Sequence, residues 1–111
     1  MNREVYRVEI EVGRMEGTQL PEDFIGAFVS VYLPATDIKE AIDLTEEYLL
    51  TDKYNPIETT AAYRLDLDDI DYDTDEEGYP GNKDLRNLLE NGGYWYGPFN
   101  GWFSVEENEK H

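Results

Sequence analysis

The sequence predicts a small α+β domain in which a mostly antiparallel sheet carries one long and one short helix on one face. Two observations predict this class: within residues 5–13, apolar and polar side chains alternate from Tyr6 to Val12, and residues 38–49 repeat apolar positions with helical spacing. The predicted order is strand, strand, helix, strand, short helix, strand, which favours a ferredoxin-like variant. No repeat or linker divides residues 1–111, so we expect one domain.

The first two strands are predicted from their side-chain patterns. In residues 5–13 the apolar positions are Tyr6, Val8, Ile10 and Val12, which alternate with Arg7, Glu9 and Glu11. Period two is typical of a strand with one buried face. Residues 14–23 contain Gly17 and Pro21 and are predicted to form a loop. Residues 27–33 are apolar on both faces, which predicts a central strand that is more fully covered than the first.

The long helix has a predicted start, face and end. Asp37 can cap its N-terminus, and Glu40 three residues later completes a capping box. The apolar positions are Ile38, Ala41, Ile42, Thr45, Tyr48 and Leu49, and the opposite face carries Lys39, Glu40, Asp43, Glu46 and Glu47. The helix is expected to end at residues 51–53, because the residue before Pro56 avoids the helical region.

The second half of the chain is predicted to hold shorter elements. Residues 57–67 form a strand that bulges or ends at Asp68, and the second strand, the long helix and this strand make a right-handed crossover. A short helix covers residues 83–90, with Asn82 as its cap and Gly92 past its end. A short strand at 94–96 and a final strand at 101–106 follow, and residues 107–111 form a frayed tail.

The charge limits the classes of partner. The chain carries 26 acids and 9 bases, a net charge of −17, so phosphate-rich membranes and naked nucleic acid would be repelled and basic proteins attracted. Residues 65–111 hold 13 acids and 3 bases, a net of −10, against −7 for residues 1–64, so the excess is concentrated. An evenly acidic surface of halophilic type, with no dedicated electrostatic target, is the alternative. The chain has no long apolar segment, no secretory pattern at its N-terminus and no cysteine, which predicts a cytoplasmic location.

Catalytic groups are scarce. The only histidine is His111, there is no cysteine, and the two serines, Ser30 and Ser104, lie in predicted strands. A Ser–His or Cys–His nucleophile is therefore excluded within this chain, and no glycine-rich phosphate loop is present. We expect no enzyme and no cofactor.

An acidic segment, residues 66–77, is the main candidate site. It holds eight acids and no base: Asp66, Asp68, Asp69, Asp71, Asp73, Asp75, Glu76 and Glu77. Asp71, Asp73 and Asp75 have the spacing of the first three ligands of a calcium loop. The sixth position is Glu76 instead of Gly, and the twelfth is Asn82 instead of Glu. Weak calcium binding by these three aspartates is therefore an alternative only.

The same segment is interpreted mainly as a surface for a basic partner. Along an extended strand, alternate carboxylates would lie about 6.5–7 Å apart on one side, a scale comparable to the phosphates of one nucleic-acid strand. Glu40, Asp43 and Glu47 on the outer face of the long helix are predicted to extend this surface. A flexible acidic loop without a target remains the alternative.

Aromatic residues form the second candidate site. Six lie within ten residues near the C-terminus: Tyr94, Trp95, Tyr96, Phe99, Trp102 and Phe103. We expect most of them in the core and one or two of Tyr94, Tyr96 and Trp102 at an interface. Lining a pocket for a small regulatory ligand is the alternative.

The predicted function is a non-enzymatic acidic protein that binds the basic surface of a partner protein, such as a nucleic-acid-binding protein or a nuclease. Anti-restriction, anti-CRISPR and toxin-immunity proteins use the same physics, and the analogy is one of charge and size. The oligomeric state is left open. Binding by this mechanism should weaken steeply with salt.

Overall fold

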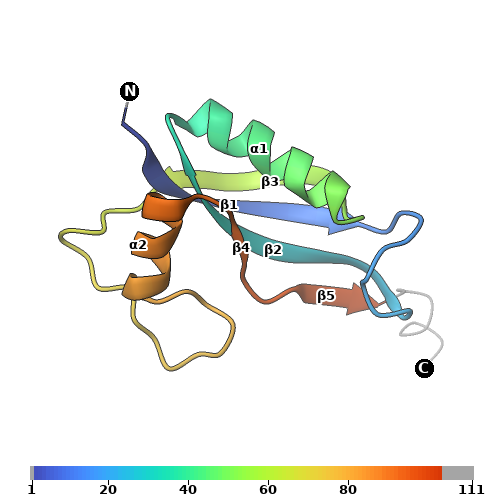
Figure 1. The fold of residues 1–111 in the computed structure, drawn as a ribbon. Helices are drawn as coiled ribbons and strands as arrows, with labels where there is room; N and C mark the ends of the chain where they lie inside the picture. The colour runs from blue at the N-terminus through green and yellow to red at the C-terminus, as the bar shows by residue number, and fades with distance from the viewer. Residues whose placement is uncertain (1, 104–111) are drawn as a thin grey trace.

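The computed structural model describes residues 2–103. Along the chain it has seven elements: β1 (Glu4–Gly13), β2 (Phe24–Ala35), α1 (Ile38–Thr51), β3 (Asn55–Arg64), α2 (Asn82–Asn91), β4 (Trp95–Tyr96) and β5 (Asn100–Phe103) (Figure 1). The predicted final strand is thus observed up to Phe103, and its residues 104–106 lie outside the described residues, as does the predicted tail 107–111.

The sheet is antiparallel throughout its pairings, with the strand order β3-β1-β2-β4, and β5 pairs with β2 beside β4. Both β2 and β3 run antiparallel to β1, so they are parallel to each other with β1 between them, and α1 connects them. The predicted α+β class and element order are confirmed. The ferredoxin-like variant is not confirmed, since the chain opens with a β1–β2 hairpin and two short strands share one edge of β2.

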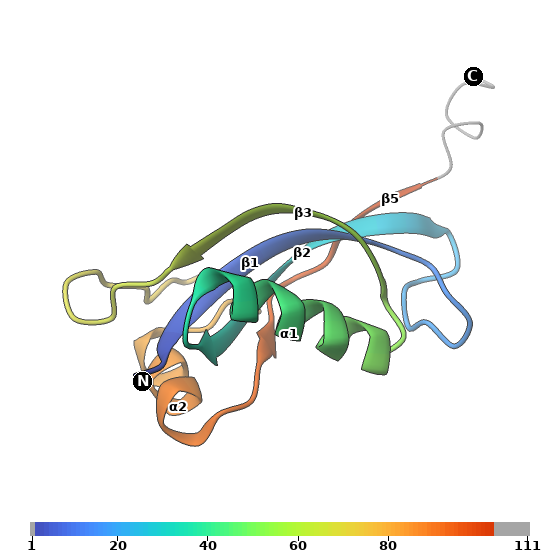
Figure 2. The same cartoon turned by 90° about the horizontal axis from the view of Figure 1, so that it is seen from above.

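The first core lies between the sheet and α1. The alternation predicted for β1 is confirmed, because Tyr6, Val8, Ile10 and Val12 are all buried. They pack with β2 side chains of the same face and with Ala41 and Leu49 of α1, which runs along one side of the curved sheet (Figure 2). We call this cluster the first core.

The start of α1 has the predicted Asp37 cap but not the reciprocal half of the predicted capping box, because Glu40 bonds to Thr36 and not to the Asp37 amide. The Asp37 side chain accepts a hydrogen bond from the Glu40 amide at 2.8 Å, and the Glu40 carboxylate accepts one from the Thr36 amide at 2.8 Å. These bonds satisfy amides that have no partner within the helix. The helix ends at Thr51, and Lys53 then adopts a left-handed backbone with φ 71°, before β3 begins at Asn55.

Two strands differ in length from the prediction. β2 runs from Phe24 to Ala35 and is longer than the predicted 27–33, because β1 and β5 supply backbone partners along it. β3 runs from Asn55 to Arg64, so it starts two residues earlier and ends three residues earlier than the predicted 57–67, and Leu65 already belongs to the following loop. Its pairing with β1 is irregular at Glu9/Ile10 and at Glu11/Val12.

The second helix differs from the prediction in two respects. α2 does not share a face with α1: its Leu85 and Leu88 pack with Val5 and Tyr32, whose side chains alternate with those of the first core along β1 and β2. This second core, completed by Leu65, covers the opposite face at one end of the sheet. The N-cap of α2 is Gly81 and not Asn82, because the Asn82 side chain bonds to the acidic segment instead.

Candidate functional site

The acidic segment forms a loop, residues 65–81, between β3 and α2. Its first part projects from one end of the molecule beside α2, as both ribbon views show (Figures 1 and 2). Tyr72 makes two hydrogen bonds that hold the loop in place. Its hydroxyl accepts a hydrogen bond from the Asp66 amide at 2.9 Å, and its amide donates to the Asn82 side chain at 2.8 Å. The loop is therefore tied both to itself and to the start of α2.

Three of the eight carboxylates hold the loop in shape. Asp66 accepts hydrogen bonds from the amides of Asp68 and Asp69, at 3.2 and 3.1 Å. Asp71 accepts from the Asp73 amide and from the Asn82 side chain, and Asp73 accepts from the Asn82 amide at 2.8 Å. Hydrogen bonds from the Asp73 backbone and then from Asn82 lower the pKa of Asp71.

These bonds remove the even spacing that the sequence predicted. The Ile70 amide bonds back to the Asp66 carbonyl at 3.1 Å, and aspartate-centred turns follow, so the segment is folded and not an extended strand. Aspartate side chains can accept hydrogen bonds from nearby backbone amides, which offers the backbone an alternative to pairing in a sheet. The likeness to the regular spacing of phosphates is therefore wrong.

The remaining five acids face solvent. We call Asp68, Asp69, Asp75, Glu76 and Glu77 the outer acidic set; all five residues are exposed. Within residues 2–103, the only base within ion-pair distance of the set is Arg86, whose Nη2 lies 3.4 Å from the Asp68 carboxylate. The Asp68 side chain is 88% exposed, so this pair neutralises little charge.

The acids of α1 do not extend this surface. α1 packs against the first-core face of the sheet, whereas the loop leads to α2 on the other face. The Glu40 carboxylate accepts a hydrogen bond from the Thr36 amide, and Asp43 pairs with Lys39 at 2.8 Å. Glu47 is exposed, but it lies on α1 apart from the loop.

Two of the candidate aromatic residues have a structural partner. The hydroxyls of Tyr94 and Tyr96 both donate to Asp52 Oδ2, at 2.8 and 2.6 Å. Tyr94 also stacks on Tyr48, with ring centroids 4.1 Å apart. Burial and the hydrogen bond to Asp52 raise the pKa of Tyr96 well above its usual value. Both rings lie against the first core, as expected for most of the aromatic residues.

Trp102 lies on the opposite face of the sheet. Its ring packs over Gly26 and contacts Phe28, with ring centroids 4.9 Å apart and a tilt of 46°. Trp102 is half-buried, and the Phe28 side chain is 47% exposed. Trp102 is thus the candidate aromatic residue that borders an uncovered apolar surface.

The calcium alternative finds no support in the loop geometry. In the described part of the chain, no three carboxylate or histidine groups lie close enough together to hold a metal ion. Asp71 and Asp73 instead share Asn82 as a hydrogen-bond partner, and Asp75 is exposed on the outer side. The three predicted ligands therefore do not converge.

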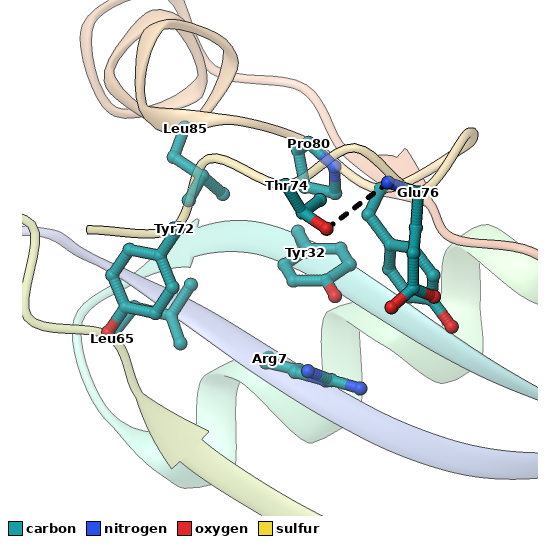
Figure 3. A pocket seen from close by; sticks show the side chains of 9 residues that line it. Arg7, Tyr32, Leu65, Tyr72, Thr74, Glu76, Pro80 and Leu85 are labelled. Carbon is teal, nitrogen blue, oxygen red and sulfur yellow. Dashed lines mark hydrogen bonds between the residues drawn. The ribbon is translucent and has the colours of Figure 1, made fainter. Parts of the chain in front are cut away.

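A cleft that the sequence patterns did not predict lies between the loop and the sheet (Figure 3). Arg7 of β1 and Tyr32 of β2 form its base, and Tyr72 and Tyr79 of the loop contribute rings. Arg7 Nε donates to Ser30 Oγ at 3.1 Å and lies 3.3 Å from Glu9 Oε2. The signal in the sequence was the strand 27–33, apolar on both faces, which requires a second covering layer.

Neither described helix has the length and apolar character needed to cross a membrane. Comparison of the chain with protein-family models, curated proteins and solved structures finds no match.

Proposed function

We propose that this protein is a non-enzymatic interaction protein that binds a basic surface of a partner protein through the outer acidic set. The observation that supports this is that the carboxylates of the loop have two roles: Asp66, Asp71 and Asp73 accept hydrogen bonds from the loop and from Asn82, while the five exposed carboxylates of the outer acidic set accept none from the loop. A loop that needed only to be polar would not require carboxylates in both roles.

The internal bonds favour tight binding. A loop that is already fastened loses less conformational entropy when a partner binds it, so more of the contact energy is retained as affinity. The concentrated negative charge attracts a basic partner over a distance and accelerates association. The outer acidic set benefits from both effects, because it lies on the ordered loop and carries the concentrated charge. We therefore expect it to dominate recognition of the partner.

The partner class that fits is a protein with a basic groove or patch, such as a nucleic-acid-binding protein or a nuclease. Such a surface normally binds phosphates, and a protein of net charge −17 competes for it electrostatically. Binding would then inhibit the partner by excluding its nucleic acid. The cytoplasm, where such partners work on nucleic acid, is the proposed location.

The test uses two variants of equal net charge. The loop variant neutralises the outer acidic set (Asp68→Asn, Asp69→Asn, Asp75→Asn, Glu76→Gln, Glu77→Gln). The control variant neutralises five exposed acids elsewhere (Glu16→Gln, Glu22→Gln, Asp23→Asn, Glu46→Gln, Glu58→Gln). A partner is captured from lysate at low salt, identified, purified and then titrated by calorimetry at increasing salt.

We expect the loop variant to lose at least about tenfold in affinity, equivalent to about 1.4 kcal/mol, and the control variant to lose less. Affinity of the unaltered protein should fall steeply between low and high salt. Equal losses in the two variants would show that net charge alone matters and would contradict the proposal. Failure of the bound protein to displace nucleic acid from the partner would rule out the inhibitory form.

A further inference from the structure

The cleft between the sheet and the loop is a separate feature from the outer acidic set. It has a volume of about 310 Å³. Arg7 lies at its base, and Tyr32, Tyr72, Leu65 and Leu85 surround it (Figure 3). The lining therefore combines one guanidinium, and the polar side chains of Thr74 and Glu76, with aromatic and apolar surfaces; a few polar groups among such surfaces are typical of small-molecule sites.

Tyr32 places a hydroxyl in this cleft that has no protein partner. The residue is only 5% exposed, and its hydroxyl makes no hydrogen bond to any of residues 2–103. The hydroxyl oxygen itself is accessible from the cleft: among the described residues, the buried side-chain oxygen without a partner is Thr59 Oγ1. A ligand in the cleft can therefore reach the Tyr32 hydroxyl. Burial raises the pKa of Tyr32, an effect that Arg7 partly opposes. The hydroxyl therefore stays protonated at neutral pH and can donate a hydrogen bond.

Arg7 is held in place but only partly used. Its Nε donates to Ser30 and lies beside Glu9, and its guanidinium carbon lies 5.5 Å from the centre of the Tyr32 ring. Its two terminal amino groups bond to no acceptor within the described part of the chain, and the side chain is 30% exposed. The guanidinium is thus oriented by protein contacts with its outer donors open.

We infer that this cleft binds a small organic monoanion, a carboxylate carried on a flat apolar body. The carboxylate would accept hydrogen bonds from the terminal amino groups of Arg7 and from the Tyr32 hydroxyl. The body would lie against the rings of Tyr32 and Tyr72 and against Leu85.

The surrounding charges favour one negative charge over two. Glu9 lies 3.3 Å from Arg7 and already neutralises part of its charge. Glu76, a member of the outer acidic set, also lines the cleft, and the whole protein carries a net charge of −17. A phosphate dianion would therefore meet more repulsion than a carboxylate. Because Tyr72 and Glu76 belong to the loop, a bound ligand would connect the loop to the sheet.

The experiment titrates the full chain with three matched probes: 4-hydroxyphenylacetate, its neutral amide, and phenyl phosphate. Binding is followed by NMR shifts of the Arg7 side-chain Nε–H and the Tyr32 ring, and by thermal shift. We expect saturable binding of the carboxylate, with the amide and the phosphate each at least about tenfold weaker. A second aromatic carboxylate, indole-3-acetate, checks that binding does not depend on one particular ring system.

Variants separate the site from general charge effects. Tyr32→Phe keeps the ring and removes only the hydroxyl, and Arg7→Gln removes the guanidinium; each should weaken carboxylate binding at least about fivefold. Lys83→Gln, which removes an exposed positive charge on α2, should leave it unchanged. If Arg7→Gln fails to fold, Tyr32→Phe alone decides the question.

Three results would overturn the inference. These are absence of saturable binding by both carboxylates, equal binding of the amide, and equal loss in Lys83→Gln and Tyr32→Phe. Tighter binding of phenyl phosphate than of the carboxylates would overturn the preference for a monoanion. None of these outcomes depends on the proposed docking function, because the partner protein is absent from the experiment.

Discussion

At the scale of single residues, Asp52 connects the end of α1 to the C-terminal aromatic segment. One of its carboxylate oxygens accepts hydrogen bonds from Tyr94 and Tyr96, at 2.8 and 2.6 Å. A hydrogen bond to an ionised acceptor is stronger than a neutral one, and it also opposes ionisation of the donor. The contact therefore stabilises the fold most where both tyrosines are protonated.

This arrangement predicts loss of stability at alkaline pH. The pKa of Tyr96 in the folded protein is raised above its usual value of 10.0, by burial first and then by the hydrogen bond to Asp52. Below about pH 10 the tyrosine is protonated in both states, and its contribution to stability is complete. Above about pH 10 the unfolded chain ionises first, so the free energy of unfolding should fall. Urea unfolding at a series of pH values measures this decline.

The matched variant is Tyr96→Phe, which keeps the ring packing against Tyr54 and Phe99. It should cost about 1 kcal/mol at neutral pH, the usual worth of one hydrogen bond, and should make the alkaline decline shallower. An equally steep decline in Tyr96→Phe would mean that other groups cause it. Tyr32 and Tyr54, whose pKa values burial also raises, would then be the next candidates.

At the scale of elements, the N-terminus of α1 is capped by the side chain of Asp37. Replacing Asp37 by alanine removes the acceptor of the Glu40 amide and should destabilise the protein by about 0.5–2 kcal/mol. Asp43→Ala, which removes only an exposed pair with Lys39, is the control and should have little effect. Chemical denaturation measures both variants; equal losses would mean that helix charge, and not the cap, is responsible.

Sequence patterns predicted those elements whose signal is local. The alternation around Val8 and Ile10 predicted β1, and Asp37 with Glu40 predicted the start of α1, because neighbouring residues alone determine these features. The prediction that α2 lies on the same face of the sheet as α1 was wrong. The spacing of Leu85 and Leu88 indicates which side of the helix is buried, but it does not indicate which face of the sheet that side packs against. The apolar character of residues 27–33 on both faces already indicated cover on both sides of the sheet.

The candidate site was predictable only in part. The acidic segment was found from composition, and exposure of Asp68, Asp69, Asp75, Glu76 and Glu77 agrees with a surface role. The hydrogen bonds of Asp66, Asp71 and Asp73 to the loop and to Asn82 could not be predicted. They depend on the path of the loop back to α2, and residue spacing in the sequence does not determine that path. The cleft at Arg7 was missed for the same reason: residues distant in sequence form it.

At the scale of the whole molecule, a net charge of −17 makes the folded state repel itself. Added salt screens this repulsion, with a screening length of about 10 Å at 0.1 M. The melting temperature should therefore rise as sodium chloride is increased from low concentration to about 0.5 M. The same salt should weaken partner binding, so stability and affinity are expected to change in opposite directions.

Scanning calorimetry over this salt range checks the prediction. The variant that neutralises the outer acidic set, with less repulsion to screen, should show a smaller rise than the unaltered protein. A melting temperature that falls with salt would show that attractive ion pairs outweigh repulsion. That outcome would be unexpected, because the four ion pairs of the described residues all lie at partly exposed side chains.

The division into two cores also has a consequence for the order of folding during synthesis. The described buried residues of the first core all lie between Tyr6 and Leu49, whereas the second core joins Val5 and Tyr32 to Leu85 and Leu88. A ribosome therefore makes all of these buried residues of the first core well before it makes Leu85 and Leu88, the partners in the second. During that interval Val5 and Tyr32 lack their partners Leu85 and Leu88, and we expect the charge of the acidic loop, which is made next, to oppose aggregation of the incomplete chain.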